Sequence, residues 1–325
     1  MAARTKSKVT PKYKTRFRVT NWREYEAGLR NRGDITVWFD EAAVDAWNAP
    51  SVGRRPGGKQ LYSNLAIITA LTLRTVFHLA LRQTEGFVAS LIRMMKMDLR
   101  APDHTTLSRR SSTVVVPSLA KTRSGPIHLV IDSTGLKMLG DGEWHAHKHK
   151  TSNKRRSWRK LHLGVDGDGF IVASELTSSG ADDATVGVTM IEKLAAPIER
   201  FTADGAYDTR GIYEAVAASS GARATIVVPP RKTASPSKPA AAVFEQRDDA
   251  IKRIAEVGRR QWRKEAGAHQ QARGANAMFR YKRLIGDSLR AKKTEAQSRE
   301  ARIAVWVLNR MAELGMPKSE AVVAA

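Results

Sequence analysis

The sequence contains no cysteine, which excludes disulfide bonds and thiolate metal sites. Aromatic residues make up only 6% of the chain, and no apolar run is long enough to cross a bilayer. The most apolar stretch, residues 65–81, is interrupted by threonine, arginine and histidine. The N-terminus is basic but lacks the apolar segment of a secretion signal. We therefore expect a cytoplasmic chain without a membrane partner.

Acidic residues are scarce relative to basic ones. The 325 residues include 55 Lys and Arg against 32 Asp and Glu, a formal net charge of +23. Such an excess favours a polyanionic partner, and nucleic acid is the simplest one. The alternative is a merely cationic protein. A hydrophobic content of 42% is enough for a substantial core, and acids at defined positions argue for a nucleic-acid enzyme.

The first part of the chain reads as a basic arm followed by helices. Residues 1–20 contain seven Lys or Arg and no acid, which predicts a flexible arm that either contacts the DNA backbone or stays solvated. Residues 21–115 are predicted to be a helical DNA-binding domain, with one helix over 63–81. The helix over 103–110 ends in Arg109 and Arg110, our candidates for base contacts. A helical packing subdomain is the other reading of this region.

From residue 126 to residue 317 the pattern changes to strands. Apolar runs predict strands at 127–131, 160–165, 170–176, 198–203 and 222–228, with a hairpin turn at 166–169. Helices are predicted at 184–194 and 209–218, and further helices at 244–265, 272–285 and 296–314. The order of three strands, helix, strand, helix, strand predicts an α/β fold with a mixed five-stranded, RNase H-like sheet. Residues 318–325 are expected to form a frayed tail.

Two acids close predicted strands of this region. Asp132 follows the apolar run 127–131, and Asp204 follows the run 198–203; each is followed closely by glycine. Carboxylate oxygens suit Mg²⁺, and two such ions about 3.5–4 Å apart can activate a nucleophile and stabilise the leaving oxygen of a phosphodiester. A turn-capping role is the alternative for either acid alone. Together they predict a metal site acting on DNA.

A basic segment lies between these acids, with an indole among its cations. Cations suit backbone phosphates and an indole can stack on a base, although a solvated hairpin would look similar. His145, His147 and His149 alternate just before it, either as a transition-metal site or as surface histidines. The predicted DNA-binding residues of the segment are Arg155, Arg156, Trp158, Arg159 and Lys160.

Several segments together carry a family resemblance: residues 130–137, 156–165, 205–210, 228–232, 269–273 and 279–282. The chain resembles the bacterial insertion-sequence DDE transposases of the insertion-sequence-five type, from about residue 25 to residue 317. The resemblance implies an RNase H-like catalytic domain, two Mg²⁺ or Mn²⁺ ions, and cleavage and strand transfer of DNA. It also implies double-stranded DNA partners (terminal inverted repeats and target DNA), a homodimer or larger assembly on DNA, and a nucleoid-associated location. By motif match, Asp132 and Asp204 carry over as catalytic and metal-binding acids, and Arg280 and Lys282 as DNA contacts.

The third acid of the family does not carry over. The family pattern is Tyr, two residues, a polar residue, three residues, Glu, six residues, Lys, and alignment on Lys282 puts Ala268 at the Tyr and Ala275 at the Glu. Glu265 and Asp287 lie too far along the chain to substitute. Two hypotheses follow: a DNA transposase, or a catalytically impaired DNA-binding protein or repressor derived from one. A generic nuclease fits less well because the resemblance includes the N-terminal helices.

Overall fold

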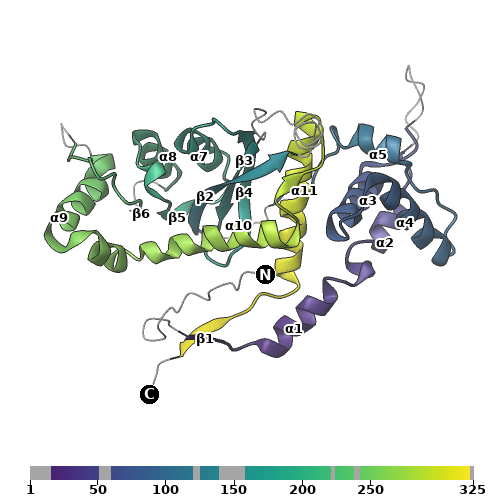
Figure 1. Cartoon of the computed structure of the whole chain (residues 1–325), viewed down its shortest axis with the longest axis horizontal. Coiled ribbons are helices and arrows are strands. Elements are labelled where there is room, and N and C mark those ends of the chain that lie inside the picture. The colour runs from purple at the N-terminus through teal and green to yellow at the C-terminus, as the bar shows by residue number, and fades with distance from the viewer. Residues whose placement is uncertain are drawn as a thin grey trace, which may run out of the picture. The chain divides into compact units, whose positions relative to one another are not determined.

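The computed structural model describes residues 16–50, 60–119, 125–138, 158–220, 224–237 and 242–322 (Figure 1). Backbone contacts divide the chain into two compact units. One unit combines residues 1–37 with residues 310–325, and the other comprises residues 38–309. The predicted histidines at 145, 147 and 149 lie outside the described residues.

The smaller unit joins the two ends of the chain. Strand β1 (Arg16–Val19) pairs antiparallel with β8 (Ser319–Val322), and helix α1 (Trp22–Asn31) and the short helix η2 (Ile35–Val37) follow β1. Asn21 fixes this pairing, because its amide donates to the Met316 carbonyl at 3.0 Å and its oxygen accepts from the Lys318 amide at 2.7 Å. The sequence predicted a flexible arm over residues 1–20 and a frayed tail over residues 318–325, so both predictions are wrong for the residues that form β1 and β8. The four-residue strands lack an apolar pattern, and only their mutual pairing forms them.

The larger unit begins with helices α2 (Glu41–Asp45), α3 (Asn64–Val76), α4 (Leu81–Met94) and α5 (His104–Arg110). Asp40, Ser63 and Asp103 cap α2, α3 and α5 by accepting from backbone amides, as capping residues do. The predicted helix over 63–81 is confirmed at its start but not at its end: α3 ends at Val76, and His78 adopts a positive φ of 55°. In the described residues no single helix is long and apolar enough to cross a membrane. Only α3 and α4 together reach the required length and composition, across a bend of 111°.

A mixed sheet forms the centre of this unit, confirming the predicted α/β class. Its strands are β2 (Ile127–Met138), β3 (Trp158–Val165), β4 (Ile171–Ser178), β5 (Ile198–Thr202), β6 (Thr225–Val227) and β7 (Ser288–Leu289). The order is β4-β3-β2-β5-β6, and β7 also pairs with β2. β2, β3 and β4 are antiparallel, whereas β5 is parallel to β2 and β6 is parallel to β5. The sheet thus has six strands and not the predicted five, because the two-residue β7 is too short to show a pattern.

Helices cover both faces of the sheet (Figure 1). On one face, residues of β2 and β5 such as Leu129, Ile131 and Phe201 pack with α7 (Asp183–Glu192) and α8 (Arg210–Ser220). On the other face, β3 residues such as Leu161 and Leu163 pack with α10 (Ala272–Leu284) and α11 (Thr294–Glu313). The remaining elements are η3 (Gly205–Tyr207), η4 (Ala242–Phe244), α9 (Glu245–Glu265) and η5 (Ala268–Gln271). Alternation along the strands therefore supplies two cores, one for each face.

Candidate active site

Asp132 and Asp204 lie at equivalent points of two paired parallel strands. The register pairs Val130 of β2 with Thr202 of β5, and each acid lies two residues beyond its member of this pair. β5 ends at Thr202, whereas β2 continues past Asp132 and pairs with β3 as far as Lys137. The predicted end of the first strand at residue 131 is therefore wrong. The strand continues because β3 supplies backbone partners to the polar residues 132–137.

The two acids differ in their surroundings. Asp132 is half-buried, and its Oδ1 accepts a hydrogen bond from the Ser133 amide at 2.8 Å. Burial raises the pKa of the Asp132 carboxyl, the Ser133 bond opposes this, and the charges of Asp204 and Asp183 raise it further. Asp204 is exposed and caps η3, with its Oδ1 accepting from the Ala206 amide at 2.8 Å. The negative charges of these neighbouring carboxylates repel one another, and a bound cation would reduce this repulsion.

Helix α10 packs directly on Asp132. A side-chain carbon at Gly274 would lie 3.0 Å from the Asp132 Cβ and 3.4 Å from a methyl of Val130. Glycine at this position lets α10 approach β2 more closely than any other residue would. The helix therefore closes one side of the site, and the residue after Gly274 is exposed beside it.

Asp183, at the start of α7, is a further acid of this region that was not predicted from the sequence. Its Oδ1 lies 3.2 Å from the Lys160 Nζ and 3.5 Å from the His162 Nδ1. Its charge acts on Asp132, as does that of Asp204. Two consecutive acids before an apolar helix read as capping residues, and Asp182 is indeed the cap of α7, accepting from the Thr185 amide at 2.8 Å. Nothing in the sequence indicates that Asp183 has a different role from Asp182.

Comparison with protein families gives two matches to this chain. A family model described as a transposase DDE domain matches residues 123–310, more than half of the chain. A second family model with the same description matches residues 30–141. The chain belongs to the DDE transposases. Transposases act on DNA, so the family implies DNA as the partner. The formal net charge of +23 agrees with this.

DDE transposases normally use divalent metal ions, and the paired acids of this transposase suit them in part. One carboxylate within the central strand and one just beyond the end of its neighbour are ligands that Mg²⁺ commonly takes from a protein, with water and substrate phosphate completing its shell. In the part of the chain that the structure describes, no group of three or more His, Asp or Glu side chains is arranged to hold an ion. The donor set thus fits an ion held by two carboxylates and otherwise hydrated.

The predicted position of the third acid lies on α10 beside this pair. Ala275 is exposed and directly follows Gly274, which contacts Asp132. The two nearest other acids along the chain form ion pairs elsewhere. Glu265 pairs with Arg253 at 2.9 Å, and Asp287 pairs with Lys137 at 2.8 Å.

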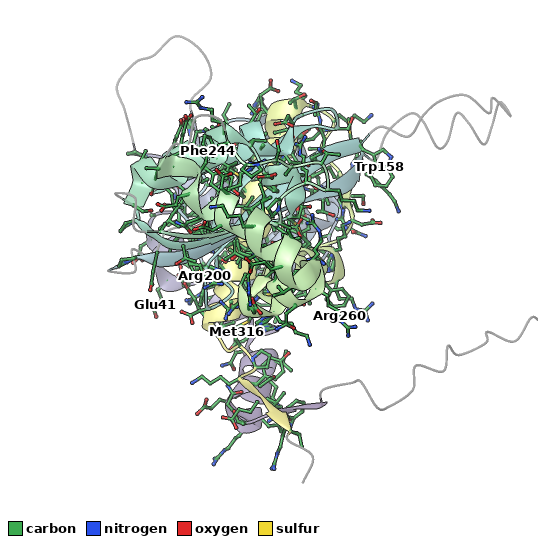
Figure 2. All side chains as sticks on the ribbon, turned by 90° about the vertical axis from the view of Figure 1, so that its left-hand side faces the viewer. Glu41, Trp158, Arg200, Phe244, Arg260 and Met316 are labelled. Carbon is green, nitrogen blue, oxygen red and sulfur yellow. The ribbon has the colours of Figure 1, made fainter. Side chains whose placement is uncertain are left out.

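The structure distributes the predicted DNA-binding residues of the basic segment over different environments. Arg155 and Arg156 lie outside the described residues. Trp158 stands at the outer start of β3 with 39% of its surface exposed (Figure 2). Arg159 donates to Thr294 and Gln297 on α11, at 2.9 and 3.1 Å, and Lys160 donates to the Ala181 carbonyl at 2.9 Å. Trp158 is therefore the freest of these for an approaching base.

The other predicted DNA-binding residues belong to helices. On α10, Lys282 is exposed, whereas the Arg280 guanidinium donates to the Gly169 carbonyl. On α5, Arg109 is exposed and Arg110 donates to the Tyr62 carbonyl at 3.1 Å. Of these four side chains, Lys282 and Arg109 present their charge to solvent.

Asp208 belongs to the same loop as Asp204 but has a structural role. Its buried carboxylate accepts from the Arg247 Nε at 2.8 Å and from the Arg231 amide at 3.0 Å, and Tyr213 lies at 3.4 Å. These bonds tie the loop after β5 to α9 and to the segment after β6. They hold the loop that presents Asp204.

Proposed function

We propose that this chain is a DNA transposase of an insertion sequence that binds terminal inverted repeats and uses a divalent-cation site formed by Asp132 and Asp204. The observation that carries the proposal is their pairing at equivalent points of parallel strands, within a chain of the DDE transposase family. The proposal includes cleavage at element ends, strand transfer to target DNA, and assembly of at least two copies on DNA. It also includes the insertion-sequence-five type and a bacterial, nucleoid-associated location.

An RNase H-like core is part of this proposal, and the strand order supports it. Three antiparallel strands in chain order are followed by two parallel strands on the far side of the first, in the order β4-β3-β2-β5-β6. The central strand β2 carries the first acid, and its neighbour β5 leads to the second. In open sheets of this kind, functional groups gather beyond the carboxyl ends of parallel strands.

The chemistry of the site follows from its charge. A bound Mg²⁺ or Mn²⁺ would polarise a phosphodiester and lower the pKa of an attacking water or 3′-hydroxyl. Asp132, fixed by the Ser133 amide and by α10, would hold the cation from the central strand, and Asp204 would hold it from the loop after β5. Trp158, Lys282 and Arg109 would contact the DNA around this centre, and Arg155 and Arg156 are retained as candidates from the sequence.

Ala275 gives this copy a second, narrower function. With alanine where the family has its third acid, we propose that the chain still binds DNA but cuts it weakly. Such a molecule would occupy inverted repeats and, by mixed assembly, repress active relatives. Ala275 is exposed on α10, so exchange between alanine and a carboxylate at this position would need no rearrangement of the core. Loss of the third acid would therefore leave the folded, DNA-binding chain intact.

The proposal is tested with a labelled duplex that carries the terminal repeat of the element, in Mg²⁺ or Mn²⁺. Binding and cleavage are measured on the same duplex for the natural chain, for Ala275→Glu, and for Ala275→Gln as the uncharged control of equal size. We expect binding by all three and a gain of cleavage for Ala275→Glu alone, abolished by a further Asp132→Asn. Absence of DNA binding would contradict the transposase function, whereas equal cleavage by Glu and Gln would contradict the role of position 275.

A further inference from the structure

Within the described part of the chain, three polar atoms of β3, α7 and η3 are buried without a hydrogen-bond partner: His162 Nδ1, Asp183 Oδ1 and Tyr207 Oη. The His162 side chain is 0% exposed and Tyr207 is 1% exposed. Buried polar groups in folded proteins normally find a partner in the chain, in water or in an ion. Three such atoms in one neighbourhood therefore indicate a place where the protein meets a polar ligand.

The contacts of these residues connect them to the two paired acids. Asp183 Oδ1 is within ion-pair distance of Lys160 and of His162, but in neither case in hydrogen-bonding geometry. His162 lies opposite Ser133 in the β2–β3 register, and the Ser133 amide donates to Asp132. Asp183 is thus linked through one strand pair to the first acid.

Tyr207 connects the same group to the second acid. It ends η3, the short helix that Asp204 caps, and a side-chain carbon at Gly187 of α7 would lie 3.0 Å from its ring. Burial raises the pKa of its hydroxyl, and the charges of Asp183, Asp204 and Asp132 raise it further. The hydroxyl therefore stays protonated and able to donate, within the field of all three carboxylates.

We propose that Asp183 is an outer-sphere carboxylate of the cation site, which accepts hydrogen bonds from water carried by the ion and does not ligate the ion itself. This inference rests on the cation site proposed for Asp132 and Asp204. It agrees with the absence of a three-residue ligand group in the described residues, because a hydrated ion needs only two protein carboxylates in its inner shell. The buried Tyr207 hydroxyl would donate to the same outer shell, and Lys160 balances the charge of Asp183 in the free protein.

The test measures binding of Mn²⁺ alone to the full chain without DNA, from the loss of the electron-paramagnetic-resonance signal of the free ion. The variants are Asp183→Asn, Asp132→Asn, and Glu192→Gln as a matched control, which removes the same charge from the exposed far end of α7. We expect Asp183→Asn to weaken Mn²⁺ binding by about 10–100-fold, as loss of an outer-sphere partner does, with little change for Glu192→Gln. Asp132→Asn should abolish binding.

The outcomes separate this inference from the proposed function. Natural affinity in Asp183→Asn, with binding lost in Asp132→Asn, would overturn the role of Asp183 and leave the cation site standing. Absence of Mn²⁺ binding by the natural chain would overturn the site and the inference together.

Lys160→Met gives a second test, in which Mn²⁺ affinity should rise where Asp183→Asn lowers it. Removal of this cation leaves the Asp183 charge uncompensated, so Mn²⁺ affinity should rise by roughly 3–10-fold. The rise should vanish when Asp183→Asn is added to Lys160→Met. A rise that persists in the double variant, or no rise in Lys160→Met, would contradict an action of Lys160 through Asp183 even if Asp183→Asn alone failed to fold.

Discussion

Because α10 packs on Asp132, we expect glycine-to-alanine substitutions at two helical positions to change the free energy of unfolding in opposite directions. Replacement of a helical glycine by alanine stabilises a helix by about 1 kcal/mol when the new methyl meets nothing. Gly86 in α4 is exposed with no atom within 4 Å of such a methyl, so Gly86→Ala should stabilise the chain by about this amount. At Gly274 the methyl would lie 3.0 Å from the Asp132 Cβ, well inside the 3.5–4.0 Å at which carbon atoms pack.

Neither partner of this contact can move cheaply, because both carbons are attached directly to the backbones of α10 and β2. Overpacking of this kind costs about 1–3 kcal/mol, which exceeds the helical gain and leaves a net loss of about 1 kcal/mol for Gly274→Ala. Urea unfolding measures the change in the free energy of unfolding for each variant. Mn²⁺ titration of the folded chain reports whether Asp132 is displaced. Equal stabilisation by the two substitutions, with Mn²⁺ affinity unchanged, would refute the close packing of α10 on Asp132.

Three further predictions follow from other contacts. Burial, then the charges of Arg273 and Arg200, lower the pKa of His128 to about 4, against about 6.5 in the unfolded chain. The unfolded state therefore binds more protons between these values, the free energy of unfolding falls as the pH drops from about 6.5 to 4, and His128→Gln should flatten this fall in urea unfolding. Asp208→Ala should cost about 3 kcal/mol, the low end for a broken buried pair, because Arg247 loses its closest carboxylate and keeps Asp248 at 3.6 Å; urea unfolding measures this cost against the exposed Asp249→Asn as control. Lys282→Ala should weaken DNA binding similarly for all sequences and lower the salt dependence by about one phosphate contact, measured by fluorescence anisotropy at several salt concentrations.

The sequence predicted the central sheet well because its strands are apolar runs bounded by turns. Helices of the larger unit were also predicted, and Asp103, at the start of the predicted helix over 103–110, caps α5. The end of α3 was predicted too late, at residue 81 and not at Val76, because residues 77–80 include neither glycine nor proline and the apolar pattern continues across them. β1, β7 and β8 were missed since two to four residues form strands only when a distant segment pairs with them.

The candidate site was predictable only to the extent that its acids follow apolar strands. Asp132 and Asp204 stand out in that way, and their parallel pairing follows from the order of the elements. Asp183 precedes a helix, where an acid is ordinary, and only the packing of α7 over β3 brings it to Lys160 and His162. Tyr207 reads as one more core aromatic, because its isolation from hydrogen-bond partners is a property of three-dimensional packing.

If Ala275 occupies the third-acid position, as we propose, its place on α10 explains how a transposase could lose that acid and keep its fold. Residue 275 is exposed, so alanine there leaves no cavity and no unpaired buried group, and α10 retains alanine's favourable helical propensity. The neighbouring Gly274 still packs on Asp132, and Asp132 and Asp204 each still lie two residues beyond the paired Val130 and Thr202 of β2 and β5. Loss of a third negative charge also reduces the repulsion that raises the pKa of Asp132 in the absence of a cation. Selection on stability would therefore not oppose this substitution, and the resulting chain would keep the surfaces that contact DNA while its cation site is held by two acids.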